Sequence, residues 1–270
     1  MKHPTTSPRF PFLSQATVAV ALVAACASAS ALPQFTFDPA AAGLLGTNIT
    51  ADNILVSSFM TVSVDPSGNF TQSGYLPITG FQLGGSSFTP AGLNTDYGMY
   101  IAFTGSGTIS VNDPTTTLNF GNLSSLSYTL YGYNGSASFG VSGATPTETA
   151  SGEVALAHGS LVSGTVLTVP AGGGGFSPSA NATLTLSVDN AGFFMSPSAF
   201  YGSVLTAFTS TPSQVEPVAG GFVVRQGGGS LNFAPVPEPS TTAMLMGGLF
   251  AVGFLYRRRQ GRWLRLAPAP

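Results

Sequence analysis

The central part of the chain alternates apolar and polar residues with a period of two, which is typical of half-buried β-strands. The alternation is clearest over residues 53–64, 126–133 and 181–188. Glycine and proline interrupt almost every window before two helical turns could form. Turn sequences such as residues 65–69 separate the alternating segments. The pattern therefore predicts an all-β domain over residues 32–234, folded as an antiparallel β-sandwich or a jelly roll.

The positions of glycine give expectations about where strands end. Asn-Gly at 134–135 is the strongest hairpin dipeptide in the chain, so residues 136–141 are expected to pair back on the strand before it. Gly-Ser-Gly at 105–107 and Gly-Ser at 159–160 are each expected to separate two strands. Residues 199–208 fit either a strand or a short helix.

An apolar run at 16–27 follows a weakly basic leader and is too short to span a membrane. Such a run is typical of a signal peptide. Ala29 and Ala31 are small residues at the positions that a signal peptidase reads, so we predict a signal peptide over residues 1–31. The alternative is a buried N-terminal helix, which would need polar residues on one face, and this run has almost none.

The only cysteine, Cys26, offers a second way to process this end. Residues 23–26 loosely resemble a lipobox, in which the chain is cut before cysteine and acylated on it. Valine stands at the first of these positions, where lipoproteins prefer leucine. Under either reading the mature protein has no disulfide, because no second cysteine is present.

The segment 235–270 combines three features in a fixed order. Its first part holds the residues Val236, Pro237, Glu238, Pro239 and Ser240. The two prolines keep this part extended, so no helix crosses it. An uncharged apolar run at 241–256 follows, which as a helix would span about 24 Å, slightly less than a ~30 Å hydrocarbon core. The basic tail 257–270 opens with Arg257, Arg258 and Arg259, which are predicted to stay on the cytoplasmic side.

This order of motif, apolar helix and arginine cluster resembles the PEP-CTERM sorting signal of Gram-negative bacteria that make exopolysaccharide. The resemblance implies a temporary anchor in the inner membrane that an exosortase recognises near the Pro-Glu-Pro. The family tail usually stops just after the arginines, whereas here residues 261–270 continue. An ordinary C-terminal transmembrane anchor is the alternative.

Three phrases in the first half of the predicted domain resemble the flocculation-associated PEP-CTERM proteins. They are residues 51–55, 74–82 and 92–100. Members of this group are secreted proteins that cells and their exopolysaccharide need to form flocs. The resemblance covers about one third of the chain and carries no catalytic motif.

Charge is distributed very unevenly. Between residues 32 and 240 Arg225 is the only basic residue against ten acidic ones, which gives this region a formal net charge of −9. A surface of this kind repels polyanions, so nucleic-acid binding is disfavoured.

We expect no cofactor, because the tetraglycine at 172–175 lacks the Lys-Ser/Thr of a phosphate-binding loop.

Candidate chemistry is sparse. His158, the only histidine after the predicted signal peptide, is expected at a strand end rather than in a catalytic triad. Most acidic residues lie in turns, so a glycan hydrolase is the weaker reading. Asp65 and Asn69 are weak candidates for calcium ligands, since Asp65, Ser67 and Asn69 place oxygens at alternate positions. No metal site is otherwise expected.

Five tyrosines in two of the alternating segments could in principle stack on sugar rings. They are Tyr97, Tyr100, Tyr128, Tyr131 and Tyr133. Their alternation favours a role in the core and in cross-strand pairs.

Taken together, these features predict an exported, non-enzymatic protein of the cell surface or extracellular matrix. It would be processed by signal peptidase and exosortase, and would support aggregation linked to exopolysaccharide or cell-surface glycans. A secreted carbohydrate-binding module is the alternative.

Overall fold

The computed structural model describes residues 32–234, and the structural statements below concern these residues. The predicted signal peptide with Ala29 and Ala31, the sorting motif and the transmembrane helix 241–256 lie outside the described residues. Within them the fold is all-β, which confirms the predicted fold class.

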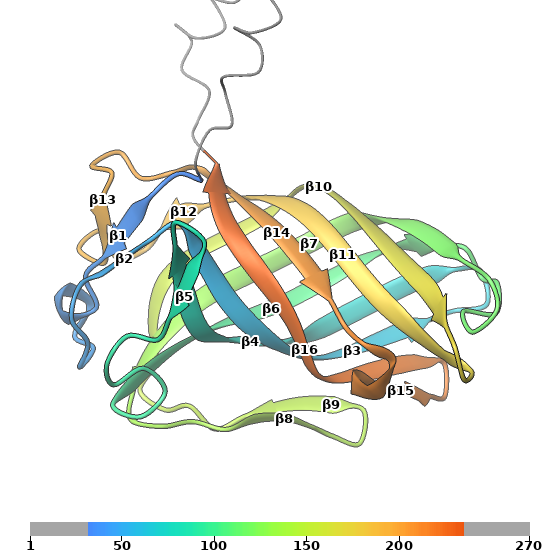
Figure 1. Cartoon of the computed structure of the whole chain (residues 1–270). Coiled ribbons are helices and arrows are strands. Elements are labelled where there is room, and N and C mark those ends of the chain that lie inside the picture. Colours follow the sequence, from blue (N-terminus) through green and yellow to red (C-terminus); the bar gives the residue numbers. More distant parts are fainter. Residues whose placement is uncertain (1–31, 235–270) are drawn as a thin grey trace, which may run out of the picture. The chain divides into compact units, whose positions relative to one another are not determined.

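The main element is an antiparallel sheet in which eight long strands close into a ring. The strand order is β11-β14-β16-β3-β4-β6-β7-β10, and β10 pairs in turn with β11 (Figure 1). We call this ring the closed sheet. Its strands are β3 Asn53–Val64, β4 Asn69–Leu83, β6 Tyr97–Ile109, β7 Asn119–Asn134, β10 Val154–Ala171, β11 Gly175–Thr185, β14 Ser203–Thr209 and β16 Gly221–Ala234.

Smaller elements surround the closed sheet. A three-stranded sheet is formed by β1 (Phe35–Phe37), β2 (Ile49–Ala51) and β13 (Phe194–Ser196), and it lies at one end of the closed sheet in Figure 1. A separate hairpin of β8 (Phe139–Ser142) and β9 (Thr145–Glu148) runs along the outside. The remaining elements are β5 Ser86–Phe88, β12 Ser187–Val188, β15 Val215–Val218 and the 3-10 turns η1 Ala40–Ala42 and η2 Pro212–Gln214.

The core at the end near the three-stranded sheet is aromatic. Phe37 is fully buried, and its ring lies 4.5 Å from Phe193 and 6.3 Å from Phe81 between centroids. Alternating side chains of the closed sheet line the rest of the interior, as the period of two requires. Burying each large apolar side chain stabilises the fold by about 1.5–3 kcal/mol, which suits a domain without disulfides.

Two predicted strand breaks are wrong, because β6 runs through residues 105–107 and β10 runs through Gly159. A Cβ at Gly107 would lie 2.6 Å from the ring of Phe70, and one at Gly159 would lie 2.6 Å from the ring of Tyr128. These glycines therefore make room for aromatic rings inside the closed sheet instead of forming turns.

The predicted hairpin at Asn134-Gly135 is also wrong. Strand β7 ends at Asn134, and β8 pairs with β9 instead of returning onto β7. The side chain of Asn134 accepts a hydrogen bond from the Leu45 amide at 2.8 Å and donates one to the Gly43 carbonyl at 2.9 Å. These contacts tie the end of β7 to the loop before β2, so tertiary structure overrides the local turn preference.

Candidate functional site

The outer face of β3, β4, β6, β7 and β10 carries serine and threonine at consecutive cross-strand positions, and we call these side chains the hydroxyl rows. The first row is Thr61, Ser73, Thr104, Ser127 and Ser160, and the second is Ser63, Thr71, Ser106 and Ser125. Two neighbouring pairs are hydrogen-bonded, with 3.1 Å between the hydroxyls of Thr104 and Ser127 and 2.8 Å between those of Ser106 and Ser125. Along each row the hydroxyls repeat at the strand spacing of about 4.8 Å.

The hydroxyl rows line a shallow hollow of about 590 Å³. A second hollow of about 480 Å³ adjoins it, because both are lined by Ser73, Thr104 and Ser127. The second hollow extends to Tyr75 and to Pro146 of β9, so the β8–β9 hairpin forms one side of it. Among the described residues, no charged side chain lines either hollow. The combined surface, which we call the outer groove, offers neutral donors and acceptors beside one aromatic ring.

Arg225 of β16 fixes the β8–β9 hairpin against the closed sheet. Its Nη1 donates to the Val141 carbonyl at 2.6 Å, and its Nη2 lies 3.5 Å from the Gly143 carbonyl. Its Nε donates to Glu216 Oε2 at 2.6 Å, which holds the guanidinium in place. The one Lys or Arg side chain between residues 32 and 240 therefore has a structural role in holding this hairpin.

An aromatic cluster packs between this hairpin and the closed sheet. The ring of Phe139 lies 5.2 Å from that of Tyr100, which in turn lies 5.9 Å from that of Tyr75. The Tyr100 hydroxyl donates to Glu153 at 3.0 Å. Burial, and then this hydrogen bond to Glu153, raise the pKa of Tyr100 far above its ordinary value.

The predicted role of the tyrosines in the core and in cross-strand pairs is confirmed, since four are buried and Tyr131 stacks on its cross-strand neighbour Tyr100 with 5.4 Å between ring centroids. Tyr97, Tyr100, Tyr128 and Tyr133 are buried. These four rings cannot stack on a sugar from outside. Tyr75, half-buried and lining the outer groove, is an aromatic side chain that can reach a ligand there, and sequence reasoning did not select it.

The weak calcium candidates form a turn. Asp65 Oδ1 accepts hydrogen bonds from the amides of Ser67 and Asn69 at 2.8 and 2.9 Å, and its Oδ2 accepts one from Asn69 Nδ2 at 2.8 Å. The side chain of Asn69, followed by these amides, lowers the pKa of Asp65. Within residues 32–234 no group of three or more His, Cys, Asp or Glu side chains could hold a metal ion.

His158 lies inside β10, so its predicted place at a strand end is wrong. It pairs with Thr129 on β7 and Ser187 on β12. Its Nδ1 is 2.8 Å from Asp189 Oδ1, and both side chains are accessible to solvent. This pair joins β10 to the turn after β12.

The sequence contains a signal for the hydroxyl rows that we did not use. Ser/Thr-x-Ser/Thr occurs at 61–63, 71–73, 104–106 and 125–127, each within one strand. One such pattern is common in any polar strand. Only the register of the neighbouring strands shows that the four pairs lie side by side.

Residues 235–259 match the PEP-CTERM protein-sorting motif. The match includes all the predicted sorting residues, Val236, Pro237, Glu238, Pro239 and Ser240, and the arginines 257–259. No curated protein and no solved structure matches the chain. Within residues 32–234 no helix is both long enough and apolar enough to cross a membrane. The chain therefore carries a PEP-CTERM sorting motif, which marks it as an exported protein that is anchored transiently in the membrane by its C-terminal segment and processed by exosortase.

Proposed function

We propose that the exported body is a non-enzymatic protein of the cell surface or the exopolysaccharide matrix, where it supports flocculation or biofilm formation. We propose further that it does so by binding a neutral glycan along the outer groove. The observation that supports this proposal most directly is the pair of hydroxyl rows, which present at least nine hydroxyls on one face of the closed sheet.

The chemistry of the outer groove favours a hydroxylated and uncharged polymer. Each serine or threonine hydroxyl can donate one hydrogen bond and accept others, as sugar hydroxyls do. The formal net charge of −9 between residues 32 and 240 would repel an acidic polysaccharide. A polymer offers the same contact many times, so weak contacts at single groups can add up to stable attachment.

The placement of the acidic side chains supports the non-enzymatic part of the proposal. Asp52 Oδ2 accepts a hydrogen bond from the Gly84 amide at 2.6 Å. Asp113 Oδ1 accepts bonds from the amide and the hydroxyl of Thr115 at 2.9 and 2.7 Å. These carboxylates, like that of Asp65, organise turns, and none of them lines the outer groove.

A binding experiment tests the role of the outer groove. The exported protein would be sedimented with purified exopolysaccharide of the producing cells, and with neutral and acidic glycans for comparison. Replacing Thr104→Val and Ser127→Ala removes two hydroxyls of the first row and should weaken binding about tenfold. The matched control, Thr183→Val with Ser203→Ala, changes the same residue types on β11 and β14 and should bind as the wild type.

Experiments in cells test the matrix role with a gene deletion, and the groove with the same variants. Deleting the gene should leave polysaccharide synthesis intact while flocs or biofilm fail to form. The gene with Thr104→Val and Ser127→Ala should restore aggregation poorly, and the control variant should restore it fully. Normal aggregation of the deletion strain would refute the matrix role. Turnover of the polysaccharide by the purified protein would instead support the alternative of a secreted hydrolase.

A further inference from the structure

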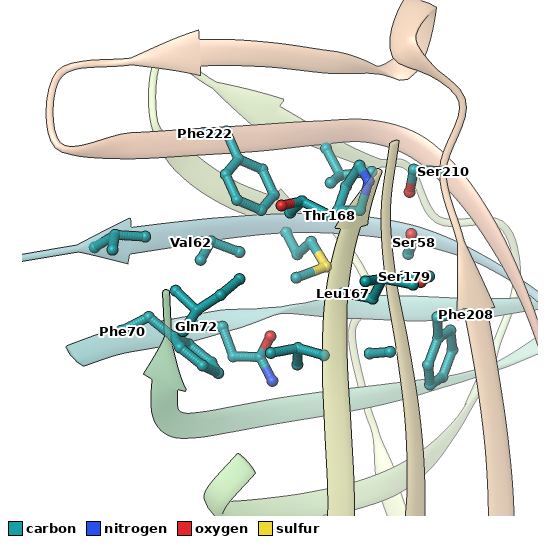
Figure 2. A pocket seen from close by; sticks show the side chains of 17 residues that line it. Ser58, Val62, Phe70, Gln72, Leu167, Thr168, Ser179, Phe208, Ser210 and Phe222 are labelled. Carbon is teal, nitrogen blue, oxygen red and sulfur yellow. The ribbon is translucent and has the colours of Figure 1, made fainter. Parts of the chain in front are cut away.

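The interior of the closed sheet is not uniformly filled. The end near the three-stranded sheet holds stacked aromatic rings, whereas the rest of the interior is lined by a mixture of aliphatic, aromatic and small polar side chains. Two cavities of about 70 and 60 Å³ lie in this part of the interior, and the first is nearer the opposite strand ends, where Val64, Phe70 and Phe222 line it. Both are lined by Ser58, Met60, Gln72, Ala180 and Phe208, so they adjoin each other across these side chains. Figure 2 shows the first cavity with its lining residues converging from several strands.

The first cavity contains a hydroxyl that has no partner. Thr168 is only 5% exposed, and its Oγ1 makes no hydrogen bond to any described residue. A buried hydroxyl without a partner costs about 1–3 kcal/mol, so this group favours a ligand that can bond it. Thr168 lines the cavity, together with Phe222 and Val62 (Figure 2).

Other polar side chains line the same cavity. Ser58 and Ser210 are 3% and 6% exposed, and a Cβ at Gly227 would collide with both of their hydroxyl oxygens. The missing side chain of Gly227 therefore lets these two hydroxyls lie against the same backbone position. The amide of Gln72 lines both cavities. Among the described residues, no charged side chain lines either cavity, so an ionised ligand group would find no counter-charge.

The second cavity is more apolar. Its lining includes Leu76, Ile101, Phe103, Leu123 and Leu231. Met60 lies between the two cavities, and its unbranched thioether side chain can change rotamer to join them. Joined, the cavities would approach the ~150 Å³ of an engineered apolar cavity that binds benzene.

We propose that the closed sheet binds, in its interior, a neutral molecule of about benzene size with an apolar body and one hydroxyl or carbonyl group. The polar group is held in the first cavity, where it bonds Thr168. The apolar body extends past Met60 into the second cavity. This site lies inside the sheet, whereas the outer groove lies on its outer face, so the two can be tested separately.

Binding of benzyl alcohol, toluene and benzoate to the exported protein tests the proposal. Saturation-transfer NMR and titration should show saturable binding of benzyl alcohol, about fivefold weaker binding of toluene, and none of benzoate. Contacts between the aromatic ring of benzyl alcohol and the methyl groups of Leu123 and Leu231 should appear in the wild-type protein. Absence of saturable binding would mean that the cavities hold only water, and would overturn the proposal.

Variants test the hydrogen bond to Thr168 separately from the volume of the two cavities. Thr168→Val should make benzyl alcohol bind no better than toluene. The control Tyr97→Phe also deletes a buried hydroxyl without a partner, but Tyr97 lines neither cavity, so binding should not change.

Ala180→Leu should fill the cavities and abolish binding of both molecules, whereas Ala207→Leu, at an exposed position on β14, should not. Unchanged binding in Thr168→Val would overturn the assigned polar contact. If Ala180→Leu does not fold, the ring–methyl contacts in the wild-type protein decide the location.

Discussion

The ring of Phe35 packs edge-on against the ring of Phe233, with 4.8 Å between their centroids. Phe35 belongs to β1, the first strand, and Phe233 lies one residue before the end of β16, the last strand. The Tyr201 hydroxyl donates to the Gln34 carbonyl at 2.8 Å beside them. The chain therefore enters and leaves the described unit at adjacent points. The last core residue, Phe233, lies two residues before the match to the sorting motif begins at 235, so processing at that motif need not disturb the fold.

The contact between the two ends should contribute strongly to stability. Phe233 also packs against Phe37, Phe200 and Tyr201, and it is buried. Phe233→Ala should lower the free energy of unfolding by about 3–5 kcal/mol, because it leaves a cavity among aromatic rings. Urea unfolding of the exported protein measures this change. Phe120→Ala is the matched control at a ring that is 64% exposed, and a loss of comparable size there would contradict the argument.

Arg225 should control the mobility of the β8–β9 hairpin. Arg225→Met keeps much of the side-chain length but removes the hydrogen bonds to Val141 and Gly143, so hydrogen exchange of the amides in 139–148 should become about tenfold faster. The transition temperature of the whole domain should change little, since Arg225 is 42% exposed.

Glu216→Gln provides the control for this prediction. It removes the charge of the ion pair but leaves the two carbonyl acceptors of Arg225 unchanged. The hairpin should then exchange at nearly the wild-type rate. If Arg225→Met also exchanged at the wild-type rate, the aromatic contacts of Phe139 rather than the guanidinium would be holding the hairpin.

Local sequence patterns predicted the strands better than their connections. The limits of β3 agree with the alternation at 53–64, because the strand buries alternate side chains along most of its length and a turn follows it. Closure of the sheet depends on the pairing of β10 with both β7 and β11, and no local pattern encodes that partnership. The glycines at 107 and 159 were wrongly predicted to end strands for the same reason. Each lies against an aromatic ring from another strand, and only the pairing of the strands shows this.

The candidate sites show the same limit. The sorting motif is local, so its residues could be read directly from 236–240 and the arginines that follow. The hydroxyl rows and the interior cavities are assembled from several strands, and a one-residue change of register would move Thr104 from the outer face to the interior. Such sites become visible only when the register is known.

High pH should unfold the protein through its buried tyrosines. Burial raises the pKa of Tyr128 and of Tyr100 well above the ordinary value of 10.0. The folded state therefore favours the neutral phenol, and the stabilisation is complete below pH 10, where the unfolded chain is also neutral. Above pH 10 the unfolded chain loses protons that the folded protein keeps, so stability falls as pH rises, by up to about 1.4 kcal/mol per pH unit for each such tyrosine. Tyrosinate absorbance should then rise together with the loss of the circular dichroism signal, and Tyr128→Phe should make the fall in stability less steep. Full ionisation near pH 10 with the fold intact would show that these phenols are open to solvent.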